Sequence, residues 1–361
     1  MSKNVFTAAD IEAHLKSGKT AADLPKGAVL TPSAKDVLRD GIGPVRAGGG
    51  SFHAAPTAFV EPILPDYEFK WTPGNDPKTP AEIHAFFHSP AIVELKQRMI
   101  DIGKRMWARE YTDGNGGNLT IRVGDNLVLC TPTLVSKGFM TIEQICLVDM
   151  EGVQLAGKYK RTSECMTHLA IMKRQPKAKA CCHAHPPHGT AFAVAGVQPP
   201  TCMIPEAEVF LGQIGLSKYE TPGTPANAVA VGDAAVDHMA VLMVNHGVIT
   251  WGKDIEDSYW KMENVESYCK TIWVASQLNG GKLLTITGGQ AKELIALRKV
   301  LGMDDKRADW TECQLCDNGG FQPGTICQIP DKASSTNNVT LDPEAEKIVQ
   351  MLTDQILTAI K

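Results

Sequence analysis

Three histidines and one glutamate occur in the chain in an order that suits an open metal site. His183-Ala184-His185 forms a close pair, Glu164 precedes it, and Asn245-His246-Gly247 follows it. Three neutral imidazoles can bind a zinc ion and leave a fourth position for a substrate oxygen. A carboxylate that stays off the metal can carry a proton. The pattern therefore predicts metal-assisted chemistry on an oxygen-rich substrate.

The histidine pair stands at the end of a predicted buried strand. Residues 178–182 are small and apolar, and Pro186-Pro187 would end the strand at the edge of a pocket. In a strand, residues i and i+2 point to the same face, so the rings of His183 and His185 can reach one ion. A lone His-x-His pair also fits ordinary histidines of the core or surface. The prediction of a metal site therefore depends on the other segments, which carry His246 and Glu164.

Those other segments are a second strand and a helix. Residues 241–245 predict a buried strand that ends at His246, where Gly247 would allow a tight turn. A helix from about Ser163 to Arg174 would set Glu164 in its first turn. There the helix dipole alone also favours a carboxylate, so a purely structural role for Glu164 stays open.

Five short motifs between about Ser89 and Leu278 resemble the class II, zinc-dependent aldolase/adducin family. In chain order they are Gly117-Asn118-Leu119-Thr120-Ile121-Arg122, Thr131-Pro132-Thr133, Thr162-Ser163-Glu164, His183-Ala184-His185 and Asn245-His246-Gly247. The resemblance covers just over half of the chain. It implies a zinc ion, or another divalent metal, held by His183, His185 and His246, with Glu164 as the proton carrier for an enediolate carbon.

The resemblance also implies an activity and an assembly. Family members that this chain resembles cleave a ketose 1-phosphate, such as L-fuculose or L-rhamnulose 1-phosphate, to dihydroxyacetone phosphate and lactaldehyde. We therefore expect a sugar-phosphate substrate and a homotetramer with its active site near a subunit boundary. A sugar-phosphate 4-epimerase of the same family is an alternative, but it is expected to have Asp where this chain has Glu164. A non-enzymatic, adducin-like interaction module is a third reading, which the retained histidines disfavour.

The predicted phosphate site combines glycines with small polar groups, which let backbone N–H groups approach an anion. By the resemblance its residues are Gly117, Asn118, Thr133, Thr162 and Ser163. One departure is Leu134, where relatives have Gly, because Leu disfavours a positive φ and would narrow the pocket. Lys137 or Lys160-Arg161 could compensate with charge, and a substrate without phosphate stays open.

The aldehyde side of the site departs from the pattern as well. The resemblance implies a Tyr soon after the metal pair, but the corresponding residues are Met203-Ile204-Pro205-Glu206. Tyr219, Glu206 or Glu208 could take that role. His168 is favoured as a core histidine over a residue supporting the site, and His188 could line the pocket.

Composition narrows the class of protein. The net charge of −4 and a pI of about 6.2 disfavour a nucleic-acid partner. No apolar run approaches the ~18 residues of a membrane span, and residues 1–7 lack a signal-peptide core. We expect a cytoplasmic protein whose ten cysteines are reduced thiols and not disulfides. Cys313-x-x-Cys316, followed by Cys327, lacks a fourth metal ligand, so loop thiols are favoured over a second zinc or redox site.

The order of predicted elements indicates three parts. Residues 1–80 form an N-terminal extension with short helices and a Gly/Pro-rich linker, 81–330 the catalytic domain, and 331–361 a polar linker and an amphipathic helix. A helix beginning at Ser89-Pro90, strands at 118–123, 127–131 and 145–149, and a long helix 255–278 capped by Asp254 are expected. They favour a three-layer α/β/α domain with a mixed sheet, and the resemblance implies that this sheet is largely antiparallel.

The tail carries one apolar stripe, which is made by Ile348, Leu352, Ile356 and Ile360. A linker followed by such a helix resembles an encapsulation peptide that targets an enzyme to a bacterial microcompartment. Residues 342–361 would then bind a shell protein as a helix in a groove, and the capped helix at residues 7–16 could do the same. Docking of the tail on its own core or on a neighbouring subunit is equally open.

Overall fold

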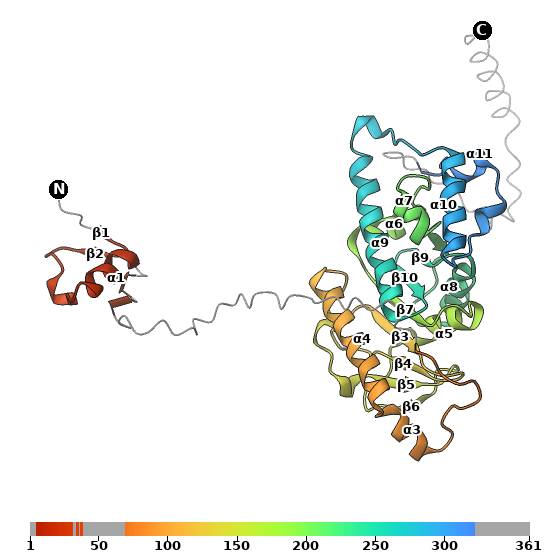
Figure 1. Cartoon of the computed structure of the whole chain (residues 1–361), viewed down its shortest axis with the longest axis horizontal. Coiled ribbons are helices and arrows are strands. Elements are labelled where there is room, and N and C mark those ends of the chain that lie inside the picture. Colours follow the sequence, from red (N-terminus) through yellow and green to blue (C-terminus); the bar gives the residue numbers. More distant parts are fainter. Residues whose placement is uncertain (1–4, 32–33, 36, 39–68, 322–361) are drawn as a thin grey trace, which may run out of the picture. The chain divides into compact units, whose positions relative to one another are not determined.

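The computed structural model describes residues 5–31, 34–35, 37–38 and 69–321, and the chain divides into two compact units, Met1–Pro65 and Asp66–Lys361 (Figure 1). In the first unit, β1 (Val5–Phe6) pairs in parallel with β2 (Val29–Leu30), and η1 (Ala21–Asp23) is a 3-10 turn. The predicted helix is α1 (Ala8–Lys16). Thr7 and Asp10 form its capping box, as predicted, and Ile11 on it is fully buried. The predicted linker at 41–50 and the tail helix at 342–361 lie outside the described residues.

The second unit is built on one eight-stranded sheet. Its strand order is β6-β5-β4-β3-β7-β10-β9-β8, and only the β8–β9 pair is parallel. The strands are β3 (Asn118–Arg122), β4 (Val128–Cys130), β5 (Cys146–Val148), β6 (Gln154–Ala156), β7 (Ala180–Ala184), β8 (Gly215–Ser217), β9 (Ala240–Met243) and β10 (Gly247–Gly252). The prediction of a mixed, largely antiparallel sheet is confirmed.

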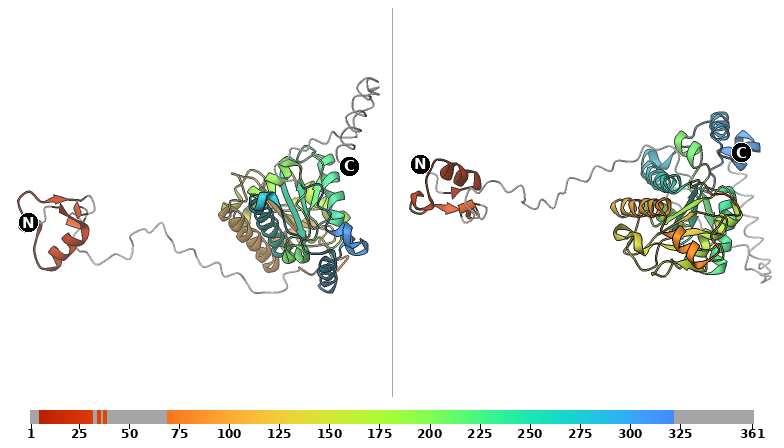
Figure 2. Two further views of the ribbon diagram at one scale, coloured as in Figure 1. Left: turned by 90° about the horizontal axis from the view of Figure 1, so that it is seen from above. Right: turned by 60° about the horizontal axis from the view of Figure 1, so that its bottom comes forward.

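Helices cover both faces of this sheet. α4 (Pro90–Ala108) and α9 (Ile255–Ala275) pack on one face, and α5 (Cys165–Arg174) and α8 (Pro225–Asp237) pack on the other. In Figure 2, α4 and α9 lie on the same side of the sheet in both views. The remaining helices are α3 (Pro80–Phe87), α6 (Pro187–Ala195), α7 (Pro205–Phe210), α10 (Gly288–Val300) and α11 (Glu312–Leu315). The 3-10 turns are η2 (Lys137–Phe139), η3 (Ile142–Gln144), η4 (Asn279–Gly281) and η5 (Lys306–Asp309).

Alternation along β7 divides the interior into two apolar cores. Ala180, Cys182 and Ala184 contribute to the core beneath α4 and α9. Cys181 contributes to the core beneath α5 and α8. Side chains of a strand alternate between its faces, so His183 projects toward the α5 side of the sheet. The predicted α/β/α layering is therefore confirmed, and it decides which helix can supply a partner for the histidines.

The two long helices begin where the sequence predicts. Ser89 precedes Pro90 at the first position of α4. The apolar residues that recur every three or four positions along this helix are buried, namely Ile92, Leu95, Met99, Ile102 and Met106. Asp254 accepts a hydrogen bond from the Asp257 backbone N–H at 2.7 Å and caps α9, which ends at Ala275, before the predicted Leu278. α9 packs on β7 and β10, the strands on either side of the histidines, and α4 packs on β3, which pairs with β7.

The segment just before α3 binds the turn between β3 and β4. The indole N–H of Trp71 and the backbone N–H of Gly74 donate to the Asp125 carboxylate, at 2.9 and 2.6 Å. In return, the Asp76 carboxylate accepts from the backbone N–H groups of Asp125 and Asn126, at 3.1 and 2.6 Å. Residues 71–76 are thus tied to the sheet by reciprocal carboxylate contacts.

One prediction about the cysteines is wrong. Cys202 and Cys316 form a disulfide across a sequence separation of 114, with their Cα atoms 5.5 Å apart. The segment carrying α10 and α11 folds back onto the loop before α7, where Thr201 Oγ1 donates to the Leu315 carbonyl at 2.9 Å. Neither the amino-acid composition nor the expected cytoplasmic location indicated this long-range contact. Cys313 is free and exposed, and Cys327 lies outside the described residues.

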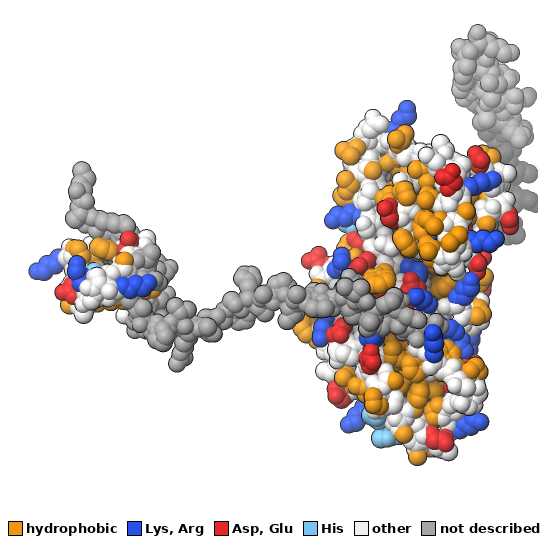
Figure 3. Space-filling model, viewed as in Figure 1, with side chains coloured by type: hydrophobic (Ala, Val, Ile, Leu, Met, Phe, Trp, Pro, Cys, Tyr) orange, Lys and Arg blue, Asp and Glu red, His pale blue; other side chains and the backbone are white. Residues whose placement is uncertain are grey.

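None of the helices in the described part of the chain has the length and apolar character of a membrane span. On the face that Figure 3 shows, positive and negative side chains of the second unit are interspersed.

Candidate metal centre

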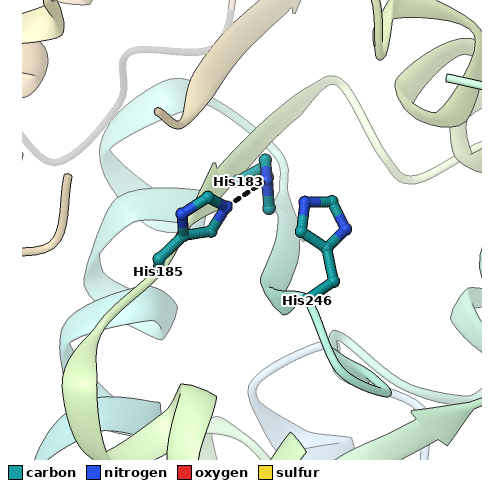
Figure 4. A group of neighbouring side chains, drawn as sticks. All are labelled: His183, His185 and His246. Carbon is teal, nitrogen blue, oxygen red and sulfur yellow. Dashed lines mark hydrogen bonds between the residues drawn. The ribbon is translucent and has the colours of Figure 1, made fainter. Parts of the chain in front are cut away.

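Two neighbouring parts of the sheet bring the three histidines together. His183 is the fourth residue of β7, His185 follows the strand, and His246 lies in the turn between β9 and β10. β10 pairs with both β9 and β7, so this turn lies beside the end of β7. Figure 4 shows the three rings pointing toward one another.

The ring nitrogens converge on one point. One ring nitrogen from each of His183, His185 and His246 lies within 4.8 Å of the others. The Nε2 atoms of His183 and His185 are 3.2 Å apart. The arrangement that the sequence predicted for the histidines is therefore present, and Glu164 adjoins it.

Gly247 has a different role from the one predicted. The residue with positive φ in the turn is Asn245, at 55°, whereas Gly247 is not in that region. A Cβ at Gly247 would lie 2.6 Å from His185 Cδ2 and 2.7 Å from the Ala184 carbonyl oxygen. Glycine is required there because the backbone passes close to both ligand segments, while Asn, which tolerates the left-handed region, makes the turn.

The hydrogen bonds of His183 and His185 indicate that two of the three convergent nitrogens lack protons. His183 Nδ1 lies 2.9 Å from the Val248 carbonyl oxygen, and His185 Nδ1 lies 2.8 Å from Asp113 Oδ1. Both partners only accept hydrogen bonds, so each Nδ1 carries the proton and donates it. In a neutral ring the Nε2 then presents a lone pair. Two lone pairs 3.2 Å apart repel unless a cation lies between them, so this donor set fits a divalent metal.

Glu164 lies at the same point. It is the N-cap residue of α5, one position before the first turn that was predicted for it. Its carboxylate oxygens are 3.3 Å from His183 Nε2 and 3.6 Å from His246 Nε2. Asn118 Nδ2 donates to Oε2 at 2.8 Å. A helix cap thus holds an acidic group against the histidine cluster, as the motif predicted.

The electrostatics of the pocket favour a positive charge beside the Glu164 carboxylate. Burial lowers the pKa of His246 to about 4, with the charge of His183 adding to the effect, so its ring is neutral at pH 7. Burial would also lower the pKa of His183, but the Glu164 carboxylate outweighs it and the net shift is upward. For Glu164, burial would raise the pKa, but the charge of His183 lowers it well below the usual range. The carboxylate therefore attracts a cation to the His183 Nε2.

Two of the residues predicted to bind phosphate contact Glu164: Asn118 Nδ2 donates to its carboxylate, and Thr162 Oγ1 accepts from its backbone N–H at 3.4 Å. Asn118 pairs with His183 in the register of β3 and β7, Thr162 and Ser163 precede Glu164, and the Thr133 backbone N–H donates to the Lys160 carbonyl at 2.9 Å. Asn118 Oδ1 is buried and has no hydrogen-bond partner among the described residues. Gly117 has a φ of 73°, and a Cβ there would lie 2.9 Å from the His183 carbonyl oxygen. Their binding of phosphate stays a prediction.

Leu134 takes up a left-handed backbone conformation, although leucine disfavours a positive φ. Its φ is 58° and its side chain is 80% exposed. Lys137 is buried, and its ammonium group donates to the carbonyls of Asn115 and Val135 at 2.8 and 2.6 Å. Arg161 donates to the carbonyls of Gly152 and Thr162 at 2.7 and 3.0 Å. Two of the three groups predicted as compensating charges, Lys137 and Arg161, are thus committed to holding loops together.

The candidates for the aldehyde side are not part of the histidine cluster. Glu208 is buried, accepts from the Cys202 backbone N–H at 2.6 Å and pairs with Arg307 Nη1 at 2.8 Å. These contacts give Glu208 a structural role, and a role as an acid or base stays a prediction. Glu206 and Tyr219 are exposed, and no contact between them and the cluster is present among the described residues.

The two other histidines considered for the site, His168 and His188, have local partners. His168 is fully buried, its Nδ1 lies 2.9 Å from Thr120 Oγ1, and burial lowers its pKa to about 3. That agrees with the favoured reading of a core histidine. His188 Nδ1 lies 2.6 Å from Glu266 Oε1, and Glu266 also accepts from the Gly189 backbone N–H at 3.0 Å. His188 therefore helps to join α6 to α9.

Sequence reasoning missed Asp113. Its contact with His185 Nδ1 is made by a residue that stands far from the histidines in sequence. One signal was present, because an Asp directly before Gly114-Asn115-Gly116 is typical of a turn that exposes a carboxylate.

Comparisons with known proteins agree with this geometry. Residues 97–273 match the model of the Class II Aldolase and Adducin N-terminal domain. The chain is 33% identical over 203 residues to a 3-oxo-tetronate 4-phosphate decarboxylase of Haemophilus influenzae, covering 55% of this chain and 95% of that protein. It is 35% identical over 179 residues to an L-fuculose phosphate aldolase of Methanococcus maripaludis, covering 50% and 96%.

Solved structures give the same picture. YgbL from Escherichia coli, described as an aldolase, epimerase or decarboxylase, superimposes with a TM-score of 0.52 at 27% identity, covering 56% of this chain and 98% of that one. An L-fuculose 1-phosphate aldolase superimposes with a TM-score of 0.53 at 23% identity, covering 58% and 97%, and supports the fold alone. The resemblance carried by the five motifs is confirmed. This chain belongs to the class II aldolase and adducin family, as a lyase that depends on a divalent metal.

Proposed function

We propose that this enzyme is an aldolase that cleaves a ketose 1-phosphate, such as L-fuculose or L-rhamnulose 1-phosphate, to dihydroxyacetone phosphate and lactaldehyde. The observation that carries the proposal is the convergence of three histidine Nε2 atoms and the Glu164 carboxylate on one point. The 35% identity to an L-fuculose phosphate aldolase supports the same activity.

The proposed ligands are His183, His185 and His246. A divalent metal bound there would act as a Lewis acid on the substrate's carbonyl and adjacent hydroxyl oxygens, and would stabilise the negative charge that develops on them. Breaking the C3–C4 bond of the ketose leaves the electron pair on C3 as an enediolate, and the C4 hydroxyl loses its proton as the aldehyde forms. Glu164 would deliver a proton to C3 to complete dihydroxyacetone phosphate.

A second candidate function is the decarboxylation of a 3-oxo-tetronate 4-phosphate. Loss of CO2 from C1 of that acid leaves an electron pair on C2, next to the C3 carbonyl. The result is the same enediolate of dihydroxyacetone phosphate. This reaction needs no base for a hydroxyl proton, and Glu206, Glu208 and Tyr219 have no described contact with the cluster. The 33% identity to a decarboxylase supports it as well.

Product analysis of the zinc-loaded enzyme separates these functions. With the two ketose 1-phosphates we expect lactaldehyde and dihydroxyacetone phosphate in equal amounts. Release of CO2 from 3-oxo-tetronate 4-phosphate, with no aldehyde from either ketose, would favour the second candidate. A 4-epimer as the sole product would indicate the epimerase, and the absence of turnover with every substrate would rule out all three.

The subunit arrangement that we propose is a homotetramer with its active site near a subunit boundary. This rests on the family alone. A mass of about 39 kDa by light scattering, equal to one chain, would contradict it.

We also propose that the tail targets the enzyme to a bacterial microcompartment, with residues 342–361 bound to a shell protein. The alternative segment, α1, is less suited, because its Ile11 is already fully buried within its own unit. Deleting residues 334–361 should leave lyase activity unchanged and abolish co-sedimentation with purified shells. Loss of zinc or of folding in the truncated protein would instead mean that the tail packs on the enzyme.

A further inference from the structure

We propose that Asp113 is a positioning residue that fixes the tautomer and orientation of His185 and so sets the affinity of the site for its metal. This rests on the proposed metal-dependent function. Asp113 Oδ1 lies 2.8 Å from His185 Nδ1. A carboxylate only accepts hydrogen bonds, so it holds the proton on Nδ1 and leaves Nε2 free to bind a metal.

The turn that carries Asp113 is shaped to present this carboxylate. The Gly116 backbone N–H donates to the Asp113 carbonyl at 2.9 Å, which closes the turn. A Cβ at Gly116 would lie 2.1 Å from Asp113 Oδ1, so any other residue at 116 would displace the carboxylate. Lys137 donates to the Asn115 carbonyl at 2.8 Å and anchors the turn from the inside.

Backbone contacts place the turn along the metal strand. The His185 backbone N–H donates to the Tyr111 carbonyl at 2.8 Å, two residues before Asp113. The segment from Tyr111 to Asp113 therefore contacts His185 twice, once through the backbone and once through the imidazole ring. This double contact fixes the distance between the carboxylate and the ring without help from a metal.

The three proposed ligands are restrained in three different ways. His183 is held by a backbone carbonyl, that of Val248. His246 Nδ1 is buried and has no hydrogen-bond partner in the described part of the chain. Among these three rings, only that of His185 is oriented through Nδ1 by another side chain in the described residues. The Asp113 side chain is 74% exposed, so it can be changed with little effect on the core.

The proposal predicts a loss of metal affinity in Asp113→Ala. Outer partners of metal-bound histidines contribute roughly 10–100-fold to metal affinity, so the dissociation constant for Zn²⁺, measured by competition with a chromophoric chelator, should rise by about that factor. Asp113→Asn, whose Oδ1 still accepts a hydrogen bond, should lie between Asp113→Ala and the wild type. Asp101→Ala, which removes an equally charged, half-exposed carboxylate from α4, should bind zinc like the wild type.

Two further measurements separate positioning from a general structural role. In long-range 1H–15N spectra of the metal-free protein at pH 8, His185 should be the Nδ1–H tautomer in the wild type and a mixture in Asp113→Ala. At saturating zinc, the kcat of Asp113→Ala should differ from that of the wild type by a smaller factor than its zinc dissociation constant does. If Asp113→Ala lowers the melting temperature, the zinc affinity of Asp113→Asn and the tautomer spectrum decide between positioning and a general structural role.

The outcomes are distinct. A zinc dissociation constant and His185 tautomer in the folded Asp113→Ala variant equal to those of the wild type would overturn the positioning role. Failure of the wild type itself to bind zinc would overturn the proposed function instead.

Discussion

Replacing His185 with alanine should remove the bound metal and abolish turnover. Two imidazoles would remain, with oxygens of the Glu164 carboxylate 3.3 and 3.6 Å from their Nε2 atoms. Because a bound metal stabilises the developing charge by several kcal/mol, turnover should fall by ~10³-fold or more. Metal content by mass spectrometry and initial rates with the best substrate of the panel measure both effects.

The matched control for that variant is His84→Ala. His84 is an exposed histidine of α3, outside the cluster. It should retain full zinc and activity. A full complement of zinc in folded His185→Ala would refute the assignment of His185 as a ligand.

Glu164→Gln should keep the metal and lose most of its turnover. The amide has the shape of the carboxylate and can still accept the hydrogen bond from Asn118 Nδ2. It cannot deliver a proton to carbon, and such a proton transfer contributes typically ~10²–10⁴-fold. Zinc stoichiometry and single-turnover rates are the measurements. Glu151→Gln, at an exposed turn, is the control and should be fully active.

Near-normal turnover of Glu164→Gln would remove Glu164 from the proton-transfer step. Loss of zinc in this variant would mean that the carboxylate is needed to hold the ion, which is the role that its contacts with two rings also allow.

The sequence predicted those parts of the molecule whose signals are local. The periodic apolar positions of α4 and the caps Ser89 and Asp254 located the two long helices, because a helix begins and buries one face according to neighbouring residues. The strand-spaced pair at His183 and His185 likewise needed only the alternation of a strand.

The errors came from contacts between distant segments. The disulfide joins Cys202 to Cys316, a contact that spacing cannot show. The ion pair of Glu208 with Arg307 is equally invisible in the sequence. Asp113 meets His185 only because the turn before β3 docks on the end of β7. The glycine at position 247 correctly indicated a special backbone position, but the sequence could not show why glycine is needed there. Close approach of another segment and a positive φ both favour glycine.

The two edge strands of the sheet also affect how this protein behaves at high concentration. Both edge strands, β6 and β8, are three residues long. At β6, the Gln154 side chain donates to the carbonyls of Gly157 and Tyr159 at 2.9 and 2.8 Å and accepts from the Arg161 backbone N–H at 3.1 Å. Edge strands this short offer little template for strands of another molecule. An enzyme with such edges can be concentrated, as enclosure within a shell would require, with little risk of edge-to-edge aggregation.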